Sequence, residues 1–252
     1  MSGLVAPRSA WPEDFPAVVI HSTVKIRNAH PAYASAKAGD AAAAVVLVRD
    51  LLNTKAVALL REIIGGRPAI LAAVTAIEKS GFNAIPDAMA HDLGKRLGLP
   101  VDAGELRQIN KVAHTRATGW HRLVTPPLFG GKVEQGQNYV LVDDHVGLGG
   151  TLANMRGYIE AGGGKVIAMT TLTESRDASK ISLYPETLNM LRLKHGKELE
   201  TFWQENTGYA FDCLTEVEAG YLFRQSSADA IRGCLAEAAE EASSSGLSAI
   251  PF

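Results

Sequence analysis

The chain has 252 residues, of which 46% are apolar and 21% are charged, an ordinary globular composition that argues against a disordered protein. Its 25 basic and 27 acidic side chains give a net charge of −2, which argues against a general nucleic-acid-binding surface. The N-terminal residues lack a secretory signal, and no apolar stretch approaches the roughly 20 residues that cross a bilayer. Two cysteines, Cys213 and Cys234, are too few for a disulfide framework or a four-ligand zinc site. We therefore expect a cytoplasmic protein with neither a membrane nor a nucleic acid as partner.

The N-terminal part of the chain predicts two helices behind a polar segment. Asp40 is placed to cap a helix over residues 41–52, and a second helix is expected over residues 54–64. The segment before them gathers basic and aromatic side chains, namely Lys25, Arg27, His30, Tyr33 and Lys37.

Two strand–loop–helix units follow. The first has a strand over 69–74, a polar loop over 75–85 and a helix over 86–97 that Gly98 ends. The second has a strand over 139–142, a glycine-rich loop over 143–150 and a helix over 151–161. Gly162–Gly164 then stop this helix, and a further strand is expected over 166–171. This alternation predicts an α/β fold with a parallel sheet flanked by helices.

The C-terminal part predicts three helices, over 185–206, 215–225 and 228–242, and Thr215 with Glu218 forms a capping box at the second. Apolar residues at helical spacing on the first of them are expected to pack on the α/β core rather than to bind a cofactor. Cys213 is expected to be a small buried hydrophobe, because no activating partner is evident. Whether the last helix serves a dimer or another partner stays open.

The segment VLVDDHVGLGGTL, residues 140–152, carries the clearest chemistry. A strand delivers Asp143 and Asp144 to the carboxyl edge of a parallel sheet, where ligands of open α/β folds bind. A glycine loop then enters a helix N-terminus, and this arrangement seats a phosphate. Acids next to such a seat repel a phosphate unless they bind sugar hydroxyls or a metal, so the pattern suggests a phosphorylated sugar with a metal. The plainer interpretation is a tight strand-to-helix connection.

This segment resembles the phosphoribosyl-pyrophosphate motif of the type I phosphoribosyltransferases. The resemblance implies the α/β fold of that family, with Asp143 and Asp144 on the ribose hydroxyls and on Mg²⁺. It assigns the 5′-phosphate to His145, Val146, Gly147, Leu148, Gly149, Gly150 and Thr151. Gly147 and Leu148 stand where the family usually has two threonines. It also allows a hood-like segment over 1–66 that selects the acceptor, ahead of a core over 67–180. The helical C-terminal extension over 181–252 lies outside the resemblance and is expected to pack on that core.

Two further loops fit the same family by position. The loop after the first strand offers Lys79, Ser80, Gly81 and Asn83 to the pyrophosphate. A basic stretch over 110–123, which includes His121 and Arg122, stands where the family has a mobile loop over the reacting centre. Its proposed catalytic residues, besides Asp143 and Asp144, are Lys111, His114 and Arg116.

These features predict a Mg²⁺-dependent phosphoribosyltransferase that acts on phosphoribosyl pyrophosphate and a nitrogenous, nucleobase-like acceptor, as a homodimer. The alternative is a regulatory protein that binds phosphoribosyl pyrophosphate or a nucleotide without chemistry. A third hypothesis is binding of nucleic acid or protein through the basic loop or the C-terminal helices.

Overall fold

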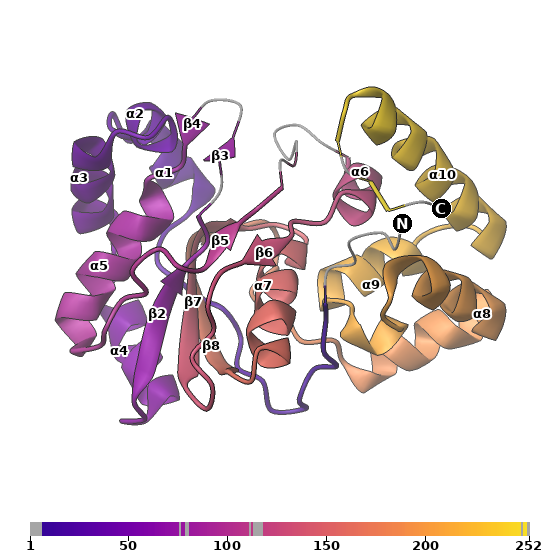
Figure 1. Ribbon diagram of the computed structural model, residues 1–252, viewed down its shortest axis with the longest axis horizontal. Coiled ribbons are helices and arrows are strands. Elements are labelled where there is room, and N and C mark those ends of the chain that lie inside the picture. The colour runs from indigo at the N-terminus through magenta and orange to yellow at the C-terminus, as the bar shows by residue number, and fades with distance from the viewer. Residues whose placement is uncertain are drawn as a thin grey trace.

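The computed structural model describes residues 7–75, 77–78, 81–110, 112, 118–247 and 249–250. A four-stranded, all-parallel sheet in the order β1-β8-β7-β2 forms its centre (Figure 1). No helix of the described ranges combines the length and the hydropathy of a membrane span. In chain order the elements are β1 (Val19–Ile20), α1 (Val24–Ala29), α2 (Tyr33–Lys37), α3 (Ala41–Leu51), α4 (Thr54–Ile64), β2 (Ala69–Ala73), β3 (Ile77–Glu78), β4 (Gly81–Phe82), α5 (Ile85–Leu97), β5 (Arg107–Gln108), α6 (Gly119–Val124), β6 (Phe129–Gly130), β7 (Asn138–Val146), α7 (Gly150–Ala161), β8 (Lys165–Glu174), α8 (Pro185–Thr207), the 3-10 helix η1 (Phe211–Cys213), α9 (Glu216–Phe223) and α10 (Ala228–Ser244).

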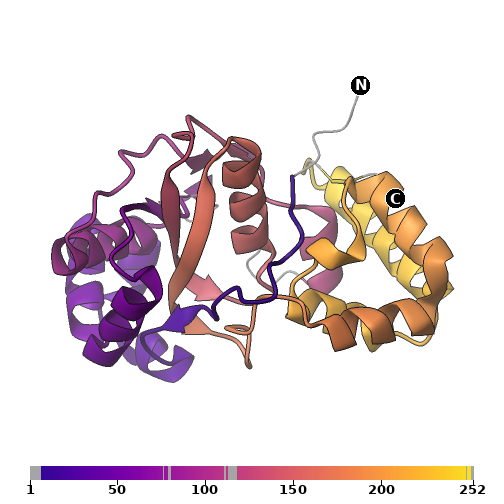
Figure 2. The ribbon, with the colours of Figure 1, turned by 90° about the horizontal axis from the view of Figure 1, so that it is seen from below.

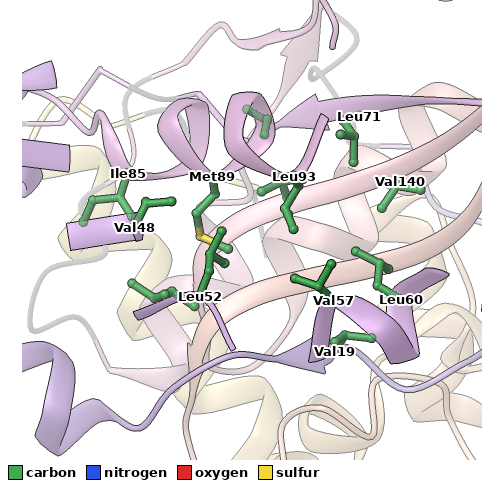
Figure 3. Packing of buried hydrophobic residues seen from close by; sticks show 14 of the residues in the cluster. Val19, Val48, Leu52, Val57, Leu60, Leu71, Ile85, Met89, Leu93 and Val140 are labelled. Atoms are coloured by element: carbon green, nitrogen blue, oxygen red, sulfur yellow. The ribbon is translucent and has the colours of Figure 1, made fainter. Parts of the chain in front are cut away.

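Helices cover both faces of the sheet. Successive residues of β7 point to opposite faces, so they pack against different helices. Val140 and Val142 face a cluster built with α3, α4 and α5, in which Leu60 and Leu93 are fully buried (Figure 3). Tyr139 and Leu141 face the other side, where α7 packs. The predicted α/β fold with a parallel sheet and flanking helices is confirmed.

The C-terminal helices have a core of their own, beyond α7 (Figure 1). The apolar residues of α8 are buried as expected, but in this cluster rather than on the core around the sheet, and Leu191, Leu199 and Trp203 are fully buried. Helix α6 belongs to this cluster through Leu123 and Val124, although it lies in the chain between β5 and β6. We call α6, α8, α9 and α10 the helical unit.

The helix ends follow the predicted capping, and one helix has an unpredicted kink. Asp40 caps α3, Gly98 ends α5 in the left-handed conformation, and Thr215 with Glu218 forms the predicted capping box of α9. Helix α4 spans residues 54–64 as expected, and the side chain of Asn53 caps it. Helix α8 has a kink at Gly196, where φ is 79°, which the sequence pattern did not predict.

Two predictions about the loops were wrong. Residues 75–85 were expected to be plain loop, but β3 and β4 pair antiparallel within this range. Strand β7 was expected to end at residue 142, but it continues to Val146. The reason is that β8 keeps pairing with it, Asp143 opposite Thr171 and Val146 opposite Glu174, after β2 has ended. The two acids therefore lie in a strand.

Residues 7–20 connect both halves of the molecule. This segment runs between α7 and the helical unit before it reaches the sheet (Figure 2). It then adds β1, which the sequence pattern did not predict, as an edge strand parallel to β8. The N-terminal segment thus contributes to the sheet itself.

Candidate phosphate and sugar site

The acid pair is buried at the carboxyl end of β7. Asp143 and Asp144 are both buried, and the N–H of Asp144 donates to Oδ1 of Asp143 at 2.7 Å. Burial, and next to it the neighbouring carboxylate, raises the pKa of Asp143 well above its usual value. Burial alone would also raise the pKa of Asp144, but the ammonium of Lys37 lowers it. Burial thus acts on both acids in the same direction, and Lys37 separates their pKa values.

Two cations of the N-terminal segment reach this edge of the sheet. Lys37, the last residue of α2, donates from Nζ to Oδ2 of Asp144 at 2.9 Å. Arg27 on α1 is buried and donates from Nη1 to Oγ1 of Thr173 at 2.8 Å, while its guanidinium stacks on Tyr33. The other two basic residues of the predicted cluster point elsewhere, because Lys25 is exposed and His30 contacts Asp50.

The loop behind the acid pair enters α7 without a side-chain cap. Gly149 has φ of 86°, a conformation that favours glycine, and helix α7 begins at the next residue. Within the described residues, no backbone carbonyl accepts a hydrogen bond from the N–H groups of residues 147–152. Gly147, Leu148 and Thr151 are partly exposed. The loop thus presents N–H groups and the positive end of the α7 dipole at the surface.

The helical unit supports the other side of the loop. The hydroxyl of Thr215 donates to the carbonyl of Leu148 at 2.5 Å, and the methyl of Thr215 lies 3.0 Å from where a Cβ on Gly149 would be. At Gly150 the same position is 2.7 Å from Oε1 of Glu218. Side chains at these two glycines would collide with buried groups, so the loop and α9 fit closely together.

Arg122 brings a positive charge to the same loop from α6. Its Nη1 lies 2.9 Å from the position of a Cβ on Gly147, so the guanidinium lies directly against this glycine. Burial lowers the pKa of Arg122, which means that its charge is held in a partly desolvated place. Helix α6 is fixed in the helical unit through Leu123 and through the ring contact of Trp120 with Tyr221. Sequence reasoning placed Arg122 in a basic stretch but not at the loop.

The other two residues assigned to the 5′-phosphate, His145 and Val146, have different contacts. His145 contacts the hydroxyls of Thr173 and Ser175 on the β8 side, each at 2.9 Å, and burial lowers its pKa. Val146 is buried in the core shared by the sheet and α7. The structure therefore brings together the acid pair, the glycine loop, Lys37 and Arg122.

Several predicted site residues lie outside the described residues, namely Lys79, Ser80, Lys111, His114 and Arg116. Gly81 lies in β4, and the Asn83 amide oxygen accepts the N–H of Ile85 at 3.2 Å in the first turn of α5. The roles assigned to these residues stay predictions. Cys213 is buried, and burial raises its pKa to about 12, as expected for an inert thiol.

The donor set at the acid pair fits a magnesium ion in one respect. Mg²⁺ in proteins is held by one or two carboxylates, completed by waters and substrate phosphates. Asp143 and Asp144 supply two neighbouring carboxylates of this kind. Within the described ranges, no group of three or more His, Cys, Asp or Glu side chains forms a metal cage.

Two curated proteins show clear sequence similarity to the chain, and no family model matches it. Protein TraN of Escherichia coli is 43% identical over 237 residues, which cover 94% of this chain and 52% of TraN. An uncharacterized protein of Haemophilus influenzae is 41% identical over 152 residues, which cover 60% of this chain and 34% of that protein. The chain spans about half the length of the first relative and about a third of the second.

Solved structures similar to this one include phosphoribosyltransferases. Adenine phosphoribosyltransferase of Thermoanaerobacter pseudethanolicus has a TM-score of 0.32 and 19% identity, over 51% of this chain and 84% of its own. Purine phosphoribosyltransferase of Pyrococcus horikoshii has a TM-score of 0.31 and 18% identity, over 48% and 82%. At these scores the similarity carries no argument about family or activity.

Proposed function

We propose that the chain binds phosphoribosyl pyrophosphate and transfers its phosphoribosyl group to a nitrogenous, nucleobase-like acceptor, with Mg²⁺ and with release of pyrophosphate. The observation that carries this proposal is the continuous segment from Asp143 to Gly150. It joins a buried acid pair to an uncapped helix N-terminus, with a cation at each end, Lys37 and Arg122.

The phosphate end of the segment suits the 5′-phosphate of the donor. Backbone N–H groups at a helix N-terminus bind anions, and the dipole of α7 adds partial positive charge. The loop lacks the two threonine hydroxyls that are usual in the family, at Gly147 and Leu148. The guanidinium of Arg122 lies against Gly147 and supplies a charged donor in their place.

The acid end suits the ribose. The carboxylate oxygens of Asp143 and Asp144 can accept hydrogen bonds from ribose hydroxyls. When bound, Mg²⁺ would neutralise charge on the departing diphosphate. Asp143 and Asp144 are the residues that would hold it. The loop containing Lys79 and the segment containing Lys111, His114 and Arg116 remain our candidates for the pyrophosphate and for proton transfer.

A second function has a specific observation in its favour. The ammonium of Lys37 already neutralises Asp144, and both usual threonines are absent from the loop. These two features suit a regulatory protein that binds phosphoribosyl pyrophosphate or a nucleotide without chemistry. In either case we propose a homodimer in the cytoplasm.

The experiment that tests both functions combines two measurements on one protein. Calorimetry with phosphoribosyl pyrophosphate and Mg²⁺ measures binding, and a coupled assay measures pyrophosphate release across a panel of nucleobases. Binding with release supports the transferase, and binding without release for any base supports the regulator. Absence of binding to both phosphoribosyl pyrophosphate and ribose 5-phosphate would refute both proposals.

A further inference from the structure

Lys37 makes the most direct contact with the acid pair of any cation in the described part of the chain. Its Nζ lies 2.9 Å from Oδ2 of Asp144, and the two residues are 107 positions apart in the sequence. The carboxylate is 8% exposed and the lysine side chain 29% exposed. The pair is therefore shielded on the side of the aspartate and reaches solvent through the lysine.

The backbone of Lys37 is firmly held. The preceding residue, Ala36, is fully buried in the core between the sheet and α3, α4 and α5. Its carbonyl accepts the N–H of Ala84, just before α5, at 3.3 Å. Asp40, which caps α3, donates its own N–H to the carbonyl of Ser35. The position of the lysine thus follows from how α2, α3 and α5 pack.

An ammonium at this distance occupies space that a metal ion needs. Mg²⁺ requires near-ideal octahedral geometry with oxygens at about 2.0–2.1 Å, and Lys37 already uses one oxygen of Asp144. Two cations on one buried carboxylate repel each other, and a low local dielectric strengthens the repulsion. The four-carbon stem of a lysine allows its head group to move away when a stronger cation or a phosphate is present.

We propose that Lys37 acts as a built-in cation that competes with the divalent metal for Asp144, so that the ligand-free protein binds metal weakly. Metal entry then requires the ammonium to leave the carboxylate, which couples metal binding to arrival of the phosphorylated ligand. The inference rests on the proposed function only for the identity of that ligand. Competition between Lys37 and the metal is a property of the ligand-free protein.

The test uses Mn²⁺ as the probe, with free Mn²⁺ measured by electron paramagnetic resonance during titration of the ligand-free full chain. We expect K37Q to bind Mn²⁺ at least tenfold more tightly than the unmodified chain. K37R retains a cation and should resemble the unmodified chain. K25Q is the matched control, because Lys25 is an exposed lysine on neighbouring α1 and its loss changes the net charge equally. The gain in K37Q should vanish in K37Q/D144N.

Three results would overturn the proposal: equal affinity of K37Q and the unmodified chain, an equal gain in K25Q, or no detectable Mn²⁺ binding by K37Q. Thermal unfolding of each variant verifies that it folds. Calorimetry with phosphoribosyl pyrophosphate on the same proteins separates this inference from the proposed function. If that ligand fails to bind while K37Q gains Mn²⁺ affinity, the proposed function fails and the role of Lys37 stands.

Discussion

Arg8 links three parts of the molecule behind the glycine loop that precedes α7, and its replacement is the sharpest test of how the helical unit is attached. Its guanidinium donates to both carboxylate oxygens of Glu218 on α9, at 2.6 and 2.9 Å, and to Oδ1 of Asn154 on α7 at 2.6 Å. It also stacks on the ring of Tyr209. The Arg8 and Glu218 side chains are only 3% and 2% exposed. Burial alone would lower the pKa of Arg8, but Glu218 more than offsets this and raises it.

We expect R8M to lower the free energy of unfolding by about 3–5 kcal/mol, the usual cost of leaving one partner of a buried ion pair uncompensated. E218Q keeps an oxygen that can accept the N–H of Thr215 and removes the charge. The double variant R8M/E218Q should therefore recover at least half of the loss in R8M, because no charge is then left buried. The measurement is urea unfolding of the four proteins at pH 7, combined as a double-mutant cycle.

Two results would refute this reasoning. A loss below about 1 kcal/mol in R8M would mean that the pair behaves like an exposed salt bridge. Strictly additive losses in the double variant would mean that Glu218 is stabilised without Arg8. The carboxylate of Glu218 also lies next to Gly150, at the start of α7. R8M should therefore weaken ribose 5-phosphate binding as well, because the uncompensated negative charge of Glu218 then lies next to the proposed phosphate-binding loop.

Three further predictions address the site and the sheet. D144N should abolish phosphoribosyl-pyrophosphate binding by calorimetry while the urea midpoint stays close to that of the unmodified chain; unchanged binding would contradict the role of the acid pair. R122Q should weaken ribose 5-phosphate binding about tenfold or more and leave ribose binding unchanged, the range expected for one charged hydrogen bond; R49Q, at 66% exposed, is the control and should have no effect. Burial lowers the pKa of His21 to about 4 from 6.5, so its neutral form is favoured in the fold and stability is lost as pH falls through this window, by about 3 kcal/mol. Unfolding by urea between pH 7 and 4 should show this loss, and H21Q should reduce it; equal pH profiles for the two proteins would contradict it.

Local sequence patterns were sufficient for the parts of the fold that depend on neighbouring residues. The strand before Asp143, the glycines before α7 and the capping box at Thr215 all depend on side chains within a few positions of one another. The end of β7 could not be placed in this way. Its last four residues remain extended because β8 offers them pairing partners, and polar residues such as Asp143 and His145 carry no strand signal of their own.

The site itself depends on contacts that no local pattern encodes. Lys37 reaches Asp144 across 107 positions, and Thr215 reaches Leu148 across 67. The departure of the loop from the usual family pattern has a physical counterpart of this kind, because the guanidinium of Arg122 lies where a side chain on Gly147 would be. A side chain at this position would require the guanidinium of Arg122 to shift. The contact between the glycine and the arginine depends on the placement of α6, which Trp120 and Leu123 hold in the helical unit.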